Sequence, residues 1–163
     1  MERHIIFFLA EDDLSYNIAV ILDELIKELD GKVRLSSQKY LGAILTELKI
    51  TLRPNSARRR DTLKVIVYSI SELYKERYKP VFNIPSFPAV SLGGYDYLGE
   101  EAVDIASELY SILSSRAHLD SEQVINRLLN RGQKISSFNV VKRSEDPEGR
   151  GGNPAVASLY KCV

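Results

Sequence analysis

The stretch from Val33 to Ile70 constrains the fold more than any other part of the chain, because its hydrophobic period changes halfway along. Its first part has apolar residues at helical spacing: Tyr40, Leu41, Ile44, Leu45 and Leu48. Ser36 or Ser37 can cap such a helix. The helical period then ends, and a Pro-Asn-Ser turn and three consecutive arginines precede a β-rich run. The pattern predicts a helix followed by two strands that are joined by a basic loop.

The polar face of this predicted helix carries small or hydrogen-bonding side chains, which can read base edges in a major groove. The candidate base-reading residues are Gln38, Lys39, Ala43 and Thr46. The candidate phosphate contacts in and beside the basic loop are Arg53, Arg58, Arg59 and Arg60. Two other readings stay open: the exposed helix face of any small domain has such a composition, and a loop tip can carry charge for solubility alone.

Charge is balanced over the whole chain but segregated along it. Lys and Arg number 22, as do Asp and Glu, so the formal net charge is zero. The segment from Lys49 to Lys64, however, contains six basic residues and a single acidic one, Asp61. The balance argues against a general polycation, and the segregation favours one cationic surface on a neutral protein.

Two halves of the sequence share a pattern that predicts a tandem repeat. Residues 25–45 and 124–144 both contain an amphipathic helix, a glycine, a basic residue and a Ser-Ser pair. Further helices are expected at 15–29, 71–77, 100–115 and 120–130, the last opened by a capping box of Asp120 and Gln123 and closed by Gly132. The Arg3–Ala10 segment fits a short helix or an edge strand. We expect an α+β, mostly helical protein with domains at 1–79 and 100–163 and an ordered Pro/Gly-rich linker at 80–99.

With these segments in view, the chain resembles the winged-helix superfamily. LSSQKYLGAILTELKI, followed by the arginine-rich loop and a strand ending in Tyr, resembles the winged helices of archaeal, plasmid and viral replication proteins and transcription regulators. EGRGGNPAVASLYK resembles the wing hairpin of such regulators. The resemblance implies two winged-helix units in tandem, in which a helix enters the major groove and a wing contacts the DNA backbone. The short segment 137–143 departs from the pattern, which puts a second recognition helix in doubt.

The second unit supplies its own candidate DNA contacts around a glycine-rich turn. They are Lys142, Arg143, Arg150 and Asn153. Three glycines at 149, 151 and 152 allow close backbone approach, although an ordinary hairpin turn needs glycines as well.

Catalysis, metal binding and cofactor binding are not expected. The GRGGN segment lacks the Lys-Ser/Thr ending and the flanking strand and helix of a phosphate-binding loop. His4 and His118 have no neighbouring carboxylate or cysteine at metal-ligand spacing. The single cysteine, Cys162, excludes an internal disulfide and fits a reducing compartment. No apolar run is long enough for a membrane span and no signal peptide is expected, so we predict a cytoplasmic protein.

The sequence therefore predicts a protein that binds double-stranded DNA and acts in replication or transcription control. The alternative is a protein-interaction adaptor within a larger replication, segregation or polymerase complex, to which zero net charge is well suited. A protein partner or a homodimer is compatible with either function, and no small-molecule substrate is evident.

Overall fold

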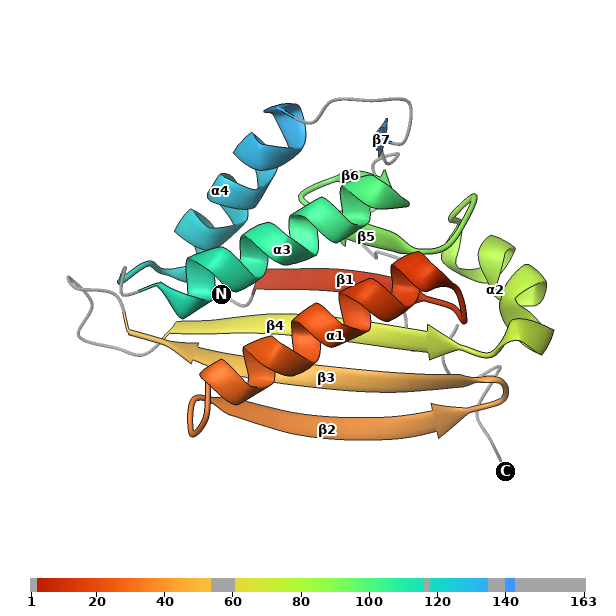
Figure 1. Ribbon diagram of the computed structural model, residues 1–163, viewed down its shortest axis with the longest axis horizontal. Helices are drawn as coiled ribbons and strands as arrows, with labels where there is room; N and C mark the ends of the chain where they lie inside the picture. Colours follow the sequence, from red (N-terminus) through yellow and green to blue (C-terminus); the bar gives the residue numbers. More distant parts are fainter. Residues whose placement is uncertain (1–2, 54–60, 116–117, 135–139, 143–163) are drawn as a thin grey trace.

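The computed structural model describes residues 3–53, 61–115, 118–134 and 140–142. Within these residues, seven strands form one mixed sheet in the order β2-β3-β4-β1-β5-β6-β7 (Figure 1). The strands are β1 (Arg3–Leu9), β2 (Val33–Tyr40), β3 (Ala43–Leu52), β4 (Asp61–Ile70), β5 (Ala89–Leu92), β6 (Tyr95–Leu98) and β7 (Val140–Lys142). The helices are α1 (Asp13–Glu28), α2 (Lys75–Phe82), α3 (Glu100–Ser114) and α4 (Ser121–Lys134), with a 3-10 turn η1 (Glu72–Tyr74) before α2.

The large sheet overturns the expected fold class. The protein is α+β, but it is not mostly helical, and its strands do not divide into two winged-helix units. The segment from Pro80 to Gly99, which we expected to be an ordered linker, contains the end of α2 and the β5–β6 hairpin. Through β5 this hairpin pairs with β1, so the strands before and after the segment belong to one sheet.

Strand β1 lies in the middle of the sheet, parallel to β4 and antiparallel to β5. Its neighbouring residues Phe7 and Phe8 point to opposite faces, and neither is exposed at all. A strand that is buried on both faces reads as a continuous apolar run without alternation. Of the two alternatives expected for this segment, the short helix was wrong and the strand was right, but the strand lies in the middle of the sheet and not at its edge.

The helix expected after Ser36 does not form, because residues 33–52 make the β2–β3 hairpin. Its turn is Leu41-Gly42, where Gly42 has φ +73°, a conformation that glycine adopts easily. The ring of Tyr74 lies directly against Gly42. The two strands predicted on either side of the basic loop are confirmed by the antiparallel pairing of β3 with β4, while residues 54–60 of the loop itself lie outside the described residues.

Helices α1, α3 and α4 confirm three of the expected helices. Asp12 caps α1, since its Oδ1 accepts a 2.8 Å hydrogen bond from Ser15 N. The capping box of α4 forms reciprocally: Gln123 N donates to Asp120 Oδ1 and Asp120 N donates to Gln123 Oε1. Gly132 does not end α4. It lies inside the helix, where it packs against the Tyr97 ring.

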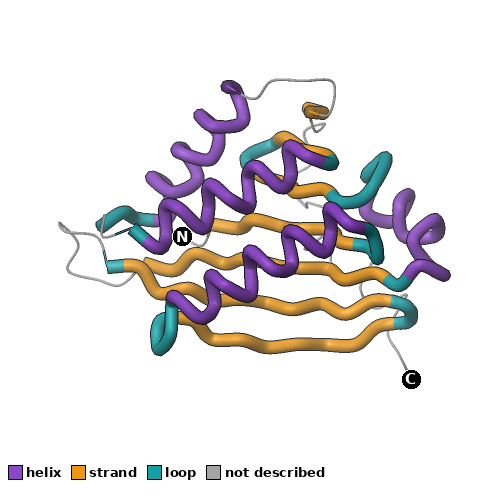
Figure 2. Tube along the Cα trace, in the orientation of Figure 1, coloured by secondary structure: helices purple, strands orange, loops and turns teal. Residues whose placement is uncertain are grey.

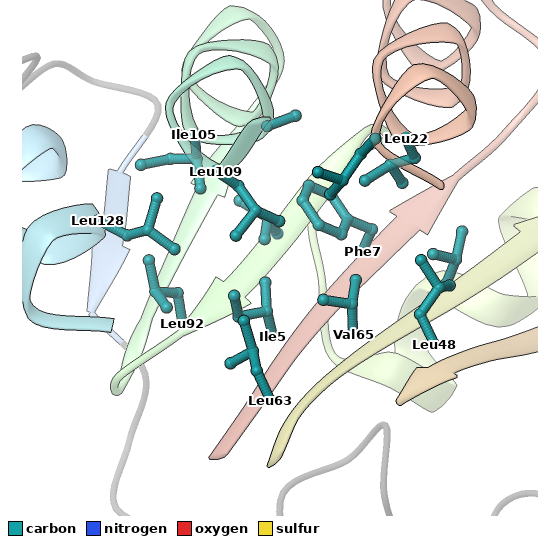
Figure 3. Close-up of a cluster of buried hydrophobic side chains, with 14 of the residues drawn as sticks. Ile5, Phe7, Leu22, Leu48, Leu63, Val65, Leu92, Ile105, Leu109 and Leu128 are labelled. Carbon is teal, nitrogen blue, oxygen red and sulfur yellow. The ribbon is translucent and has the colours of Figure 1, made fainter. Parts of the chain in front are cut away.

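Helices cover both faces of the sheet, but unequally (Figures 1 and 2). We call the face under α1, α3 and α4 the helix face and the opposite one the α2 face. Figure 3 shows the helix-face core, in which helix and strand side chains interdigitate: Leu22, Ile105, Leu109 and Leu128 meet Ile5, Phe7, Leu48, Leu63, Val65 and Leu92. The smaller core of the α2 face is built from aromatic and aliphatic residues of β1, β4 and α2. Within the described part of the chain, no helix combines the length and the apolar character that a membrane crossing needs.

Candidate interaction edge and groove

The four residues expected to read bases lie in strands β2 and β3 and are divided between the two faces of the sheet. Lys39 and Thr46 share the helix face with the buried Leu48, because directly paired and alternate strand residues lie on one face. Gln38 and Ala43 lie on the α2 face, where Ala43 is only 5% exposed. The expected recognition surface therefore does not exist as one helix face.

The remaining predicted DNA contacts are only partly within the described residues. Arg53 follows β3 beside a cavity of about 430 Å³, and its carbonyl oxygen is 3.3 Å from His118 Nδ1. Lys142 ends β7 and pairs with Tyr95 through the backbone. Six further predicted contacts lie outside the described residues: Arg58, Arg59, Arg60, Arg143, Arg150 and Asn153.

Strand β2 forms one edge of the sheet, and within the described chain it pairs only with β3. It contains neither proline nor glycine, and residues 34–39 are all exposed. Arg34 and Lys39 stand near its two ends, while the middle of the strand is uncharged. Sheet edges of this length are usually covered, broken or paired with another strand.

The hydrogen-bond pattern shows which backbone groups of β2 point away from the sheet. Thr51 N donates to Lys32 O at 2.9 Å, and Lys32 and Thr51 are opposite each other in the β2–β3 register. Because such bonded pairs alternate along an antiparallel ladder, even-numbered residues of β2 bond to β3. The N–H and C=O groups of the odd-numbered residues therefore point outward: Val33, Leu35, Ser37 and Lys39.

Exposed apolar side chains gather beside this edge. Among the described residues, seven large hydrophobic side chains are exposed, and five of them belong to α1 or the β2–β3 hairpin: Tyr16 (69%), Val20 (41%), Leu35 (50%), Leu41 (44%) and Ile44 (42%). Leu35 and Ile44 lie on the helix face, the same side of the sheet as α1. Clustered apolar exposure of this kind marks surfaces that contact another molecule.

A groove of about 830 Å³ opens between the N-terminal half of α1 and the end of the β2–β3 hairpin. Tyr16 and Ala19 line it from α1, and Lys39 and Ile44 line it from the strands. The groove is open at this place because α1 runs diagonally across the sheet: the helix begins over the centre of the sheet and ends over the start of β2 (Figures 1 and 2). We call this feature the α1/β3 groove.

The acidic β1–α1 loop closes one end of the α1/β3 groove. Its side chains already hold the backbone in place: Asp12 accepts from the backbone and hydroxyl of Ser15, and Glu11 Oε2 accepts from Glu72 N at 2.7 Å. No set of three His, Cys, Asp or Glu side chains arranged to bind a metal occurs among the described residues. The loop therefore gives the groove a negative end.

The tip of the β2–β3 hairpin is held from the α2 face. The Tyr78 hydroxyl donates to the Leu41 carbonyl at 2.5 Å, and Ser71 N donates to the Gly42 carbonyl at 2.9 Å. Beneath it, Tyr68 stacks with Phe8. Burial, together with the nearby Tyr40, raises the pKa of Tyr68 to about 12. These contacts fix the strand ends that form one wall of the groove.

A row of basic residues crosses the α2 face. Arg34 is opposite Lys49, and Lys49 is opposite Lys64. Glu47 partly compensates the row, since its Oε1 is 3.8 Å from Lys49 Nζ and 3.9 Å from Lys64 Nζ. Like charges in direct cross-strand positions are destabilising.

Sequence reasoning singled out Gln38, Lys39 and Ala43, but as parts of a helix, and it missed the exposed apolar residues of the edge and groove. Tyr16 and Val20 are spaced i, i+4 outside the buried stripe of α1, which is a readable signal for a second apolar surface. Leu35 gave no such signal, because it was assigned to the approach to a helix. None of the protein-family models, curated proteins or solved structures compared with this chain matches it.

Proposed function

We propose that the protein is an interaction module that binds another protein by accepting a strand on the free edge of β2. The observation that carries the proposal is the combination of six consecutive exposed residues on an edge strand, residues 34–39 of β2, with exposed apolar side chains on α1 and the β2–β3 hairpin. Main-chain hydrogen bonds along an edge supply affinity, and the neighbouring pockets supply specificity.

The groove supports this function because it lies where side chains of an added strand would project. The outward backbone groups belong to the residues whose side chains lie on the helix face, including Leu35 and Ser37. Helix-face side chains of an added strand would therefore lie next to Leu35, and those near the end of β2 would reach the α1/β3 groove.

A photo-crosslinking experiment in the cells that produce the protein tests the proposal. A benzophenone amino acid replaces Gln38, which is exposed on the edge, and for comparison Ser107, which is exposed on α3. We expect covalent adducts from position 38, identified by mass spectrometry, and no comparable adducts from position 107.

Two substitutions at a single position separate strand addition from other contacts. Ser37→Pro removes an outward N–H while the hydrogen bonds to β3 remain, and proline is tolerated on the free side of an edge strand. Ser37→Ala keeps the N–H and serves as the matched control. The adducts at position 38 should disappear with proline and persist with alanine. Equal yields for both variants, or no adducts above the level of position 107, would contradict the proposed function.

We propose nucleic-acid binding as a second candidate, which the basic row on the α2 face favours. The contact would be made to phosphates and not through a recognition helix, because residues 33–52 are strands. The row comprises Arg34, Lys49 and Lys64.

A salt series with a random-sequence duplex tests this second candidate. Lys49→Gln should make the log–log dependence of affinity on salt shallower by about one unit. Lys27→Gln, which removes an exposed charge on α1, should leave the slope unchanged. No binding at low salt, or the same slope for both variants, would refute phosphate contact through the row.

A further inference from the structure

The edge of β2 is self-complementary, which bears on what the added strand is. When two copies of one strand pair antiparallel about a two-fold axis, outward-directed residues must oppose outward-directed residues. The outward residues of β2 are all odd-numbered. An odd-numbered residue of one copy must then oppose an odd-numbered residue of the other. The midpoint between two odd residue numbers is itself a residue number, so the two-fold axis must pass through a residue and not between two residues.

We propose that a second copy of this chain supplies the strand, with the two-fold axis at Ser36; this rests on the proposed protein-binding function of the β2 edge. In this register Val33 of one copy opposes Lys39 of the other, and Leu35 opposes Ser37. The two-fold axis generates each of these pairs twice. All four outward residues of each strand are then hydrogen-bonded across the interface. An axis at Ser37 would instead leave Val33 opposite Leu41, which belongs to the hairpin turn.

The charges of β2 favour this register. Arg34 opposes Gln38 on the α2 face, and Lys39 opposes the apolar Val33 on the helix face. Arg34 and Lys39 lie on opposite faces, so they never oppose each other in any register that keeps the faces aligned. Axes through Arg34 or Lys39 themselves would bring identical positive charges together, which is unfavourable.

The diagonal path of α1 also makes the helix faces of two copies complementary. The α1/β3 groove lies beside the end of β2, and the C-terminal end of α1 lies over the start of β2 (Figure 1). An antiparallel pair of β2 strands places the start of one beside the end of the other. The C-terminal end of α1 in one copy would thus face the groove of the second copy.

Each of these two places carries one lysine among acidic residues. The last turns of α1 carry the exposed Glu24 and Lys27. The groove carries Lys39 from β2 and the acidic Asp13 from the start of α1. Glu24 of one copy would meet Lys39 of the other. Tyr16 and Ile44, which line the groove, would be covered in the same contact.

Sedimentation of the purified full chain over a concentration series tests for the second copy. We expect a monomer–dimer equilibrium that Ser37→Pro weakens at least tenfold and Ser37→Ala leaves nearly unchanged. A monomer at every concentration, or equal effects of the two variants, overturns the inference.

Cysteine crosslinking tests the register, in a chain whose only native cysteine is removed by Cys162→Ser. With the axis at Ser36, the two Ser36 residues form a non-hydrogen-bonded pair with Cα atoms about 4.5 Å apart, within reach of a disulfide. The two Ser37 residues lie on a diagonal of about 7–8 Å. Under oxidised glutathione, Ser36→Cys should therefore give covalent dimer at least ten times faster than Ser37→Cys or the surface control Ser107→Cys. Equal rates, or a faster Ser37→Cys, overturn the proposed register.

The two proposals fail in different ways. Crosslinks from position 38 to a different protein, together with a monomer in solution, would leave the interaction function standing and remove the second copy. Absence of any proline-sensitive contact at β2 would remove both.

Discussion

Asp61→Asn should loosen the attachment of α4 to the sheet. Asp61 lies at the start of β4, where its Oδ2 accepts from Ser121 N at 2.5 Å and its Oδ1 accepts from Thr62 N at 2.9 Å. Ser121 begins α4 and is 4% exposed, so its N–H has poor access to water. An asparagine can present only one oxygen. One of the two donors would then face an amide NH₂ group, at a cost of about 1.5–3 kcal/mol for a hydrogen bond to a charged group.

The pH dependence of stability should change with the same substitution. Burial raises the pKa of Asp61, but the hydrogen bonds from Ser121 and Thr62 outweigh burial and leave the pKa below its ordinary value. A carboxyl whose pKa is lower in the folded state stabilises the fold above its unfolded pKa, about 3.9, and this contribution is lost as the pH falls through the folded value. Asp61→Asn should abolish that part of the acid sensitivity.

Urea unfolding at pH 7 and at several acidic pH values measures both effects. Asp120→Asn is the matched control, because Asp120 caps the same helix and asparagine caps as well as aspartate. We expect Asp120→Asn to change the free energy of unfolding by less than about 0.5 kcal/mol. If Asp61→Asn is as mild as Asp120→Asn, or retains the wild-type acid dependence, the account of the α4 attachment is wrong.

Three further predictions concern packed glycines and a buried phenol. Gly42→Ala should destabilise the protein by at least about 1–2 kcal/mol, because a positive φ is strained for alanine and its Cβ would collide with the Tyr74 ring; thermal unfolding measures this. Gly132→Ala should also destabilise in thermal unfolding, although alanine favours helices by about 1 kcal/mol, because its Cβ would overlap the buried Tyr97 ring; a rise in stability would contradict the packing. Tyr68 keeps its proton in the folded state up to a pKa of about 12, so stability should fall as the pH rises from about 10 to 12, by about 2–3 kcal/mol in total. Tyr68→Phe should remove this alkaline loss in urea titrations.

Several elements could be predicted because their local sequence pattern is compatible with only one type of secondary structure. The helix expected at 15–29 and the capping box of Asp120 and Gln123 correctly predicted α1 and α4. Two strands around the basic loop were also correct. In each case the pattern, the cap and the turn residues agree with one another.

The region from Val33 to Leu52 shows why the rest could not be predicted. Its apolar residues satisfy helical spacing from Tyr40 to Leu48, but they also alternate from Leu48 to Leu52, and Gly42 provides a hairpin turn. Pairing with β4, which is distant in sequence, decides between the two readings. The same long-range pairing places β1 in the middle of the sheet and leaves β2 at its edge. The edge and groove therefore became recognisable only with the strand order.

Site-resolved hydrogen exchange of the β2 amides, measured over a range of protein concentrations, tests the central claim most directly. At concentrations where the chain is monomeric, Arg34 and Ser36 should be protected by β3, while Leu35 and Ser37 exchange freely. As the concentration rises, Leu35 and Ser37 should become protected as well, because the second strand takes up their outward groups. Protection of all four amides at the lowest concentration, or none at Leu35 and Ser37 at the highest, would contradict strand addition by a second copy.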